Sequence, residues 1–198
     1  MNFKEDDGEY HTYTFSGADT LKVEVKRCAV YLEESEDQDM HLEVNQNGGN
    51  QEVDVQNSGN VVTVTSDSEE RPESEIYIYL PEKVKMKEIK IDAGGSYVTM
   101  ESVRTEKLDV TVGAGSVEVY DSVEAENSSW NVGAGTIYAC MEGAKEDYNY
   151  TIGCGVGTVE LPGEDYSGLG MVKKIDNGAK QELNIECGVG SVEFEFED

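Results

Sequence analysis

The chain has 198 residues, and 15 lysines and arginines against 42 aspartates and glutamates give it a formal net charge of −27. This charge repels phosphate backbones and anionic lipid, so no nucleic-acid partner is expected. Met1–Tyr10 does not show the apolar core of a signal peptide, and no apolar run approaches the roughly 20 residues that a transmembrane helix needs, so we expect no anchor and no membrane insertion by this chain.

Histidine and cysteine are scarce. There are only two histidines, and no two of the four cysteines have the CxxC spacing of zinc knuckles and thioredoxin-like redox pairs. The sequence therefore supports neither a zinc site nor a redox pair. No cofactor and no metal are therefore expected.

Residues 1–12 are predicted to form an N-terminal extension, and residues 13–198 a single domain. Residues 13–80 alternate apolar and polar positions in short segments such as Val30–Leu32 and Ile76–Leu80, which indicates strands in loosely built coils. The acidic run Glu33–Asp39 between two of these strands could hold calcium, but it lacks the spacing of a known calcium loop, and a solvated loop is the alternative.

Residues 81–163 contain regular repeats. The strings VGAGSVEV, VGAGTIYA and IGCGVGTVE begin at Val112, Val132 and Ile152, twenty residues apart. Each joins an apolar residue through a glycine turn to an alternating strand, whereas a dinucleotide-binding glycine motif would be followed by a helix. The repeats predict coils of about 20 residues.

Like residues then stack between coils in columns. Before the turn we align Ile91, Val112, Val132, Ile152 and Ile185. After the turn we align Val98, Val117, Ile137, Val159 and Val192. The predicted fold is all-β: a single-stranded parallel β-helix (β-solenoid) without substantial helix.

The regular spacing is interrupted once. Residues 164–182 are predicted to be an insertion with a tight turn or hairpin tip at Asp176-Asn177-Gly178, and residues 183–198 the last coil and cap. Cys154 and Cys187 share an inward column, and we expect them to remain reduced thiols.

Outward positions supply the candidate binding surface. Exposed tyrosines can stack on sugar rings or anchor a protein interface, and carboxylates add an acidic character. Polysaccharide lyases and glycosidases that are built on β-helices also place acidic residues on one face. A column of exposed glutamates more often keeps a sheet soluble, however. No catalytic residue is assigned, and the candidate binding residues are Tyr77, Tyr79, Glu118, Tyr120, Tyr138, Glu160 and Glu193.

The segment IYIYLPEKVKMKEIKIDAGGSYVTMESV, with an opening strand pair from Phe15 and the closing GVGSVEFEF, resembles the bacterial "putative adhesin" β-helix family of unknown function. The resemblance covers the chain from about residue 13. It implies a right-handed coil and a location at the cell surface or outside the cell. Since the sequence shows no signal peptide or anchor, a cytoplasmic location is the alternative. That family has no accepted catalytic residues.

The leading hypothesis is a non-enzymatic, adhesin-like surface or scaffold module that binds a protein or glycan through a rigid acidic face. One alternative is a structural element that self-assembles through its open ends, although a monomer is favoured because the tail from Glu193 resembles a cap. A carbohydrate-active enzyme is the other alternative.

Overall fold

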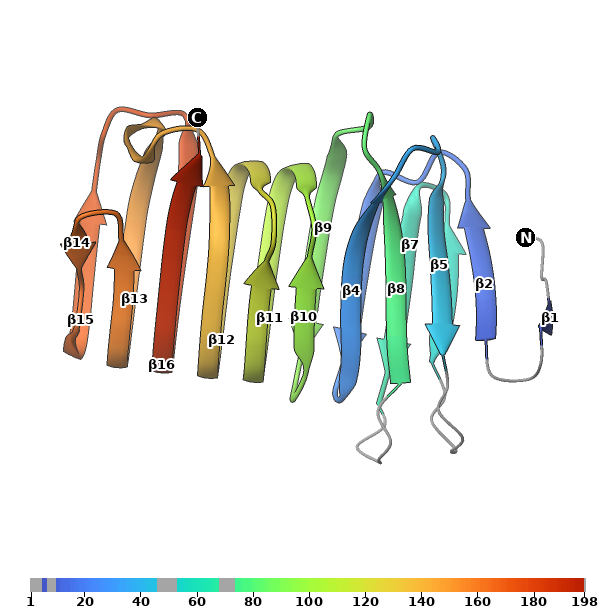
Figure 1. Cartoon of the computed structure of the whole chain (residues 1–198), viewed down its shortest axis with the longest axis horizontal. Coiled ribbons are helices and arrows are strands. Elements are labelled where there is room, and N and C mark those ends of the chain that lie inside the picture. Colours follow the sequence, from blue (N-terminus) through green and yellow to red (C-terminus); the bar gives the residue numbers. More distant parts are fainter. Residues whose placement is uncertain (1–4, 7–9, 46–52, 68–73, 198) are drawn as a thin grey trace.

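The computed structural model describes residues 5–6, 10–45, 53–67 and 74–197, and these residues are almost entirely β-strand (Figure 1). Within this part of the chain the helical content is one 3-10 turn at Lys145–Asp147, so the predicted all-β class is confirmed. Much of the predicted extension, residues 1–12, lies outside the described residues, but Tyr10 already begins a strand.

The strands form one hydrogen-bonded network of 16 members. They are β1 (Glu5–Asp6), β2 (Tyr10–Phe15), β3 (Thr20–Val25), β4 (Cys28–Ser35), β5 (Met40–Asn45), β6 (Asp54–Ser58), β7 (Val61–Ser66), β8 (Ser74–Pro81), β9 (Met86–Ala93), β10 (Tyr97–Met100), β11 (Val103–Val119), β12 (Val123–Glu142), β13 (Tyr148–Leu161), β14 (Glu164–Asp165), β15 (Gly168–Ile175) and β16 (Gln181–Glu197).

The network is arranged as two layers that face each other, as in a solenoid (Figure 1). β3, β9 and the first half of β11 pair in parallel in one layer, and β4, β10 and the second half of β11 pair in parallel in the other. The long strands β11, β12, β13 and β16 cross from one layer to the other. Alternating residues such as Val23, Ile91 and Val110 fill the space between the layers and are fully buried.

The turn between the layers has a constant length. In every coil, the inward residue before the turn and the inward residue after it are five positions apart in the sequence. These pairs, each in register with the next, are Val25 and Val30, Ala93 and Val98, Val112 and Val117, Val132 and Ile137, Cys187 and Val192, and Cys154 and Val159. The predicted column after the turn is therefore confirmed.

The predicted register before the turn is wrong by two residues at two steps, while Val112 pairs with Val132 and Ile152 with Ile185 as predicted. Ile91 pairs with Val110 rather than with Val112, and Val112 pairs with Ala93. Ile152 pairs with Ile185, which in turn lies beside Trp130 rather than beside Val132. Neighbouring inward positions are all apolar, so the period of two alone could not choose between the two alignments.

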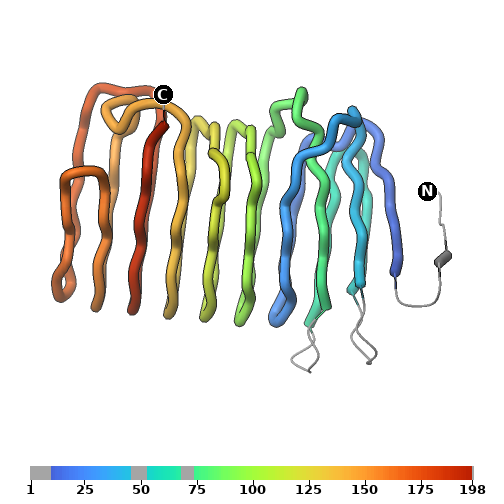
Figure 2. Tube along the Cα trace, in the orientation of Figure 1, coloured from blue at the N-terminus to red at the C-terminus, as the bar shows by residue number. Residues whose placement is uncertain are grey.

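β16 does not lie at the end of the solenoid. It pairs in parallel with β12 on one side and with β13 on the other, so that the last coil in sequence order lies between the two preceding ones (Figure 2). The prediction that residues 183–198 form the cap is therefore wrong. Phe194 of this inserted strand is buried, with its ring 5.5 Å from that of Trp130 and perpendicular to it.

Antiparallel strands close both ends, so the sheet is mixed rather than the purely parallel β-helix that we expected. β5 and β2 follow β8 at one end, where β6 also pairs with β7. At the other end the predicted insertion forms β14 and β15, which fold back on β13. Asp176-Asn177-Gly178 is not a hairpin tip, because it leads from β15 to β16 on opposite sides of β13.

Candidate functional site

The layer that contains β4, β8 and β10 presents an outward row of tyrosines and carboxylates. In register across the strands, this row runs through Tyr77, Tyr31, Thr99, Glu118, Tyr138, Glu193 and Glu160. Five of the seven residues predicted for the binding surface lie in it. The row results from strict alternation, because each member stands between two buried apolar neighbours.

The other two predicted residues lie beside this row. Tyr79 is directly opposite Glu33, two residues along from the pair Tyr77 and Tyr31. Tyr120 follows β11 two residues after Glu118 and is 64% exposed, the most exposed tyrosine of this face. We refer to the row together with Tyr79 and Tyr120 as the tyrosine face.

A hollow of about 510 Å³ opens in the tyrosine face where β4, β10 and the end of β11 meet. Its lining consists of Tyr31, Leu32, Glu33, Tyr97, Thr99, Glu101 and Tyr120. Of these, Tyr120 belongs to the predicted binding surface and Glu33 to the acidic run considered for calcium. Tyr31 and Tyr97 alternate with the buried Val30, Leu32 and Val98 and could have been found by the same rule.

Hydrogen bonds and stacking hold the tyrosines around the hollow. The Tyr97 hydroxyl lies 3.0 Å from Glu118 Oε2, to which it donates, and 3.3 Å from the hydroxyl of Tyr120. The rings of Tyr31 and Tyr77 are stacked with centroids 4.6 Å apart and an interplanar angle of 11°. These contacts fix ring positions before any ligand arrives, which reduces the entropy lost on binding.

Several tyrosines on or beside this face have a raised pKa. The pKa of Tyr138 is raised to about 12, chiefly because its hydroxyl donates to Glu195 at 2.7 Å, with burial as the second cause. The pKa of Tyr79 is also raised to about 12, by burial and then by the negative charges of Glu43 and Glu33. The pKa of Tyr97 is raised by its hydrogen bond to Tyr120, by burial and by Glu118.

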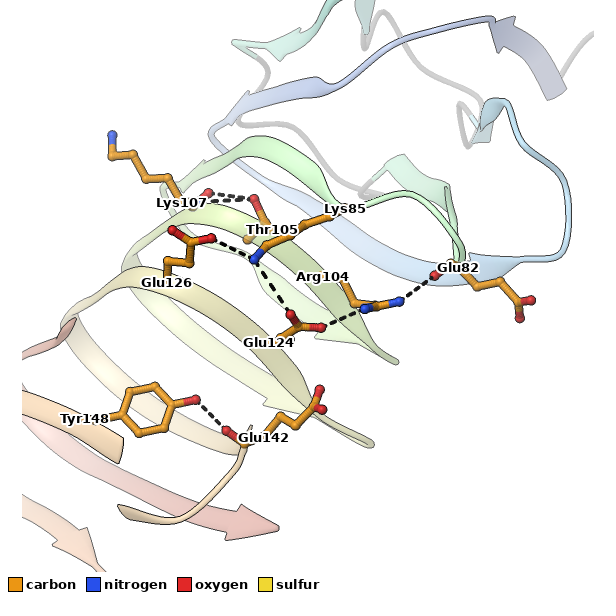
Figure 3. A network of polar contacts seen from close by, with 9 residues as sticks. All are labelled: Glu82, Lys85, Arg104, Thr105, Lys107, Glu124, Glu126, Glu142 and Tyr148. Atoms are coloured by element: carbon orange, nitrogen blue, oxygen red, sulfur yellow. Dashed lines mark hydrogen bonds and ion pairs between the residues drawn. The ribbon is translucent and has the colours of Figure 1, made fainter. Parts of the chain in front are cut away.

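Several basic side chains pair with carboxylates elsewhere in the solenoid. Lys85 Nζ lies 2.9 Å from Glu126 and 3.7 Å from Glu124, and Arg104 Nε lies 2.8 Å from Glu124 (Figure 3). Arg104 lowers the pKa of the Glu124 carboxyl. These ion pairs offset part of the negative charge of the carboxylates near the turns into β11 and β12. Among the described residues, by contrast, the lining of the hollow contains no lysine or arginine.

Two aspartates of the acidic run 33–39 use their carboxylates in contacts with the protein itself. Asp37 Oδ2 lies 3.0 Å from His41 Nε2, Asp37 Oδ1 accepts from the backbone N–H groups of Gln38 and Asp39, and Asp39 Oδ2 accepts from Ser16. Over the described ranges, no three histidine, cysteine or acidic side chains are grouped so that they could hold a metal ion.

Cys154 and Cys187 are direct neighbours on β13 and β16, as expected from their shared column. Both are buried free thiols. Burial and the neighbouring Cys154 raise the pKa of Cys187, so this thiol stays protonated and weakly nucleophilic near neutral pH. No helix in the described part of the chain has the length and hydrophobicity needed to cross a bilayer.

Solved structures with similar folds cover nearly the whole chain. One is a putative cell adhesion protein from Clostridium sporogenes, with a TM-score of 0.64 and 19% identity over 96% of this chain and 99% of that one. Another is a putative adhesin from Bacteroides fragilis, with a TM-score of 0.45 and 12% identity over 95% of this chain and 98% of that one. None of the curated proteins matches the chain.

At this identity, the match to the Clostridium sporogenes structure shows a shared fold. The family profile described as Toastrack DUF4097 matches residues 18–146, from β3 to the turn that precedes β13. Since this match spans more than half of the 198 residues, the chain belongs to the Toastrack DUF4097 family.

Proposed function

We propose that the protein is a non-enzymatic binding module, displayed at the cell surface or outside the cell, whose tyrosine face holds a protein or glycan partner. The observation that carries this proposal is the hollow beside Tyr31, Tyr97 and Tyr120, in which aromatic rings and carboxylates meet on a continuous sheet. Aromatic side chains with a polar end are the commonest anchors of protein interfaces and also stack on sugars. The names of the adhesin-like relatives support the location and the general class.

Rigidity supports the same function. The strands that carry the face are joined by parallel ladders over β8, β4, β10, β11, β12, β16 and β13. A face built in this way changes little on binding, so a partner meets a prearranged set of side chains.

A non-enzymatic function fits the carboxylates better than hydrolysis does. Glu118, Glu193 and Glu160 lie in one row and leave the sheet on the same side. Glycosidases place their two carboxylates on opposite sides of the bond that is cleaved, so that one protonates the leaving group while the other attacks or activates water. Neighbours in one row of a flat face do not flank a substrate in this manner.

Self-assembly remains the second candidate function, and β15 is the observation that favours it. This strand lies at one edge of the sheet and exposes Leu169 and Val172, at 85% and 72%. The same strand carries Lys173 and Lys174, however, and edge lysines are a common way to prevent pairing between chains. The expected state in solution is therefore a monomer.

The proposal can be tested with glycan arrays and with partner capture from cell-surface extracts. The variant Tyr31→Ala/Tyr120→Ala should lose the signal of the wild type, because both rings line the hollow. Thr111→Ala, at an outward position of the opposite layer, is the matched control and should keep the signal. Equal binding by all three proteins would contradict the assignment of the face, and turnover of an acidic polysaccharide by the wild type would contradict its non-enzymatic character.

A further inference from the structure

The hollow in the tyrosine face has a composition that points to one class of ligand. We infer that it binds a small organic ammonium ion, such as a quaternary ammonium group. The inference rests on the proposed function, because it assigns a ligand class to the same face.

The aromatic part of the lining suits a cation. Three phenol rings, those of Tyr31, Tyr97 and Tyr120, border the hollow. The face of an aromatic ring carries negative charge density and attracts an ammonium group placed over it, and several rings together hold quaternary ammonium ligands. The hydroxyl contacts of Tyr97 with Tyr120 and Glu118 keep two of these rings close together.

The charged part of the lining has the complementary sign. Glu33 and Glu101 line the hollow, and Glu101 Oε2 is positioned by a hydrogen bond of 3.1 Å from the backbone N–H of Glu34. The lining holds no lysine or arginine among the described residues, while Lys85 and Arg104 pair with carboxylates elsewhere. With a formal net charge of −27, the chain as a whole also attracts cations.

The polar groups fit an ammonium ion better than a neutral sugar. The two carboxylates of the lining can accept from sugar hydroxyls, but among the described residues its only side-chain donors for sugar oxygens are the hydroxyls of Thr99 and of the three tyrosines. The Tyr97 hydroxyl already donates to Glu118. A quaternary ammonium ion needs no hydrogen-bond donor from the protein, and only charge and contact area hold it.

The size of the hollow fits one small ligand or a single group of a larger partner. Its volume of about 510 Å³ falls within the range of about 300–1,000 Å³ that is usual for small-molecule sites. Leu32 and the buried Thr99 form part of its lining, so a methylated ammonium group would also lose contact with water there. Loss of water strengthens the attraction between a cation and an aromatic ring.

The direct experiment titrates the full chain with choline and follows tyrosine ring signals by NMR. The uncharged isostere 3,3-dimethylbutan-1-ol has the same shape without the charge and is the matched ligand control, and cellotriose serves as a neutral sugar. We expect saturable shifts with choline, at least about fivefold weaker binding of the isostere, and weaker choline binding at ~0.5 M NaCl.

Variants then locate the site. Tyr31→Leu and Tyr97→Leu each remove one aromatic wall and should weaken choline binding about fivefold, whereas Tyr120→Phe keeps its ring, loses only the hydroxyl contact with Tyr97 and should weaken binding less. Glu101→Gln should weaken binding about twofold to fivefold. Thr111→Ala, at an outward position of the opposite layer, should have no effect. Circular dichroism establishes that each variant is folded.

Three results would overturn the inference. Equal affinity for choline and its isostere would mean that the site is merely apolar. Saturable binding of cellotriose without binding of choline would reject the ammonium ligand and leave the proposed function intact. Absence of binding by all three ligands would also reject the inference, while the array and capture experiments test the proposed function independently.

Discussion

A β-carbon added at Gly135 would lie 1.8 Å from the carbonyl oxygen of Gly115 in the neighbouring coil. Gly135 also has a φ of 150°, in a region that other residues rarely adopt. The same relationship recurs from Gly190 to Gly135 and from Gly157 to Gly190, so that the glycines of successive turns stack against one another. The spacing of the coils at this turn therefore depends on the absence of a side chain.

Gly135→Ala is expected to destabilise the fold by at least about 3 kcal/mol, because the contact is with backbone and neither coil can yield without breaking its ladder. Chemical denaturation measures the loss. Gly95→Ala is the matched control in an equivalent turn, where the nearest backbone atom would lie at an ordinary 3.6 Å. It should cost less than about 1 kcal/mol. Equal losses for the two variants would show that the stacked glycines are not required.

Phe194 tests the contribution of the inserted strand. Phe194→Ala should cost about 3–5 kcal/mol, since the ring is buried against Trp130 and its removal leaves a cavity between β12 and β13. Phe194→Leu, which keeps most of the volume, should cost less than about 1.5 kcal/mol. Denaturation followed by the fluorescence of Trp130 reports both values. A small loss for Phe194→Ala would mean that β16 contributes little to the core.

Tyr138 should show a specific dependence on pH. Its folded-state pKa of about 12 exceeds the ordinary value of 10.0, so the unfolded chain releases the phenolic proton first as the pH rises. Stability is therefore fully present below pH 10 and falls as the pH rises towards 12. Glu195→Gln removes the charged acceptor and should lower the pKa of Tyr138 towards 10, measured by phenolate absorbance.

Tyr79 is the internal control for that titration. Its pKa is raised to about 12 by burial, Glu43 and Glu33, none of which the variant changes. Its ionisation should therefore occur at the same pH in Glu195→Gln and in the wild type. A joint shift of both tyrosines would indicate a general loosening of the face rather than the loss of one hydrogen bond.

The cysteines should be unreactive in the folded protein. The pKa of Cys140 is raised to about 11 by burial and by Glu197, Glu195 and Asp121, so its alkylation should be slow at pH 8 and accelerate towards pH 11. Unfolding without reductant should allow alkylation at all four cysteines, as measured by mass spectrometry. Recovery of a peptide that links Cys154 to Cys187 would contradict this expectation.

The edge strand β15 allows a test of self-assembly. Lys173→Val/Lys174→Val removes both charges from an exposed strand that already carries Leu169 and Val172, and light scattering should then detect association. Lys173→Arg/Lys174→Arg keeps the charge and should remain monomeric. Association of the wild type on addition of salt alone would instead favour the structural alternative.

Much of the fold could be predicted from periodicity. Alternation placed Val117, Ile137 and Val159 in one buried column after the turn, and the structure confirms their stacking. The position of β16 could not be predicted in the same way. All coils share a turn of one length and inward positions of similar size, so the sequence of one coil contains little information on which coil lies beside it.

The candidate face was predicted in part for a similar reason. Tyr77, Glu118 and Tyr138 were identified as outward residues from alternation within single strands, and the register brings them into one row. The hollow depends on β4 lying beside β10, whose residues are far apart in the sequence. Tyr31 and Tyr97 meet only through that pairing, which periodicity within one strand does not reveal.

The insertion of β16 sets an order of events during synthesis. Residues 148–161 (β13) leave the ribosome before residues 181–197 (β16). In the folded protein, however, β13 is connected to β12 only through its ladder with the later strand β16. A nascent chain therefore cannot complete this solenoid by adding one coil after another. It must hold β13 away from β12 until the intervening strand emerges, and any premature pairing of the two has to open again before the native arrangement can form.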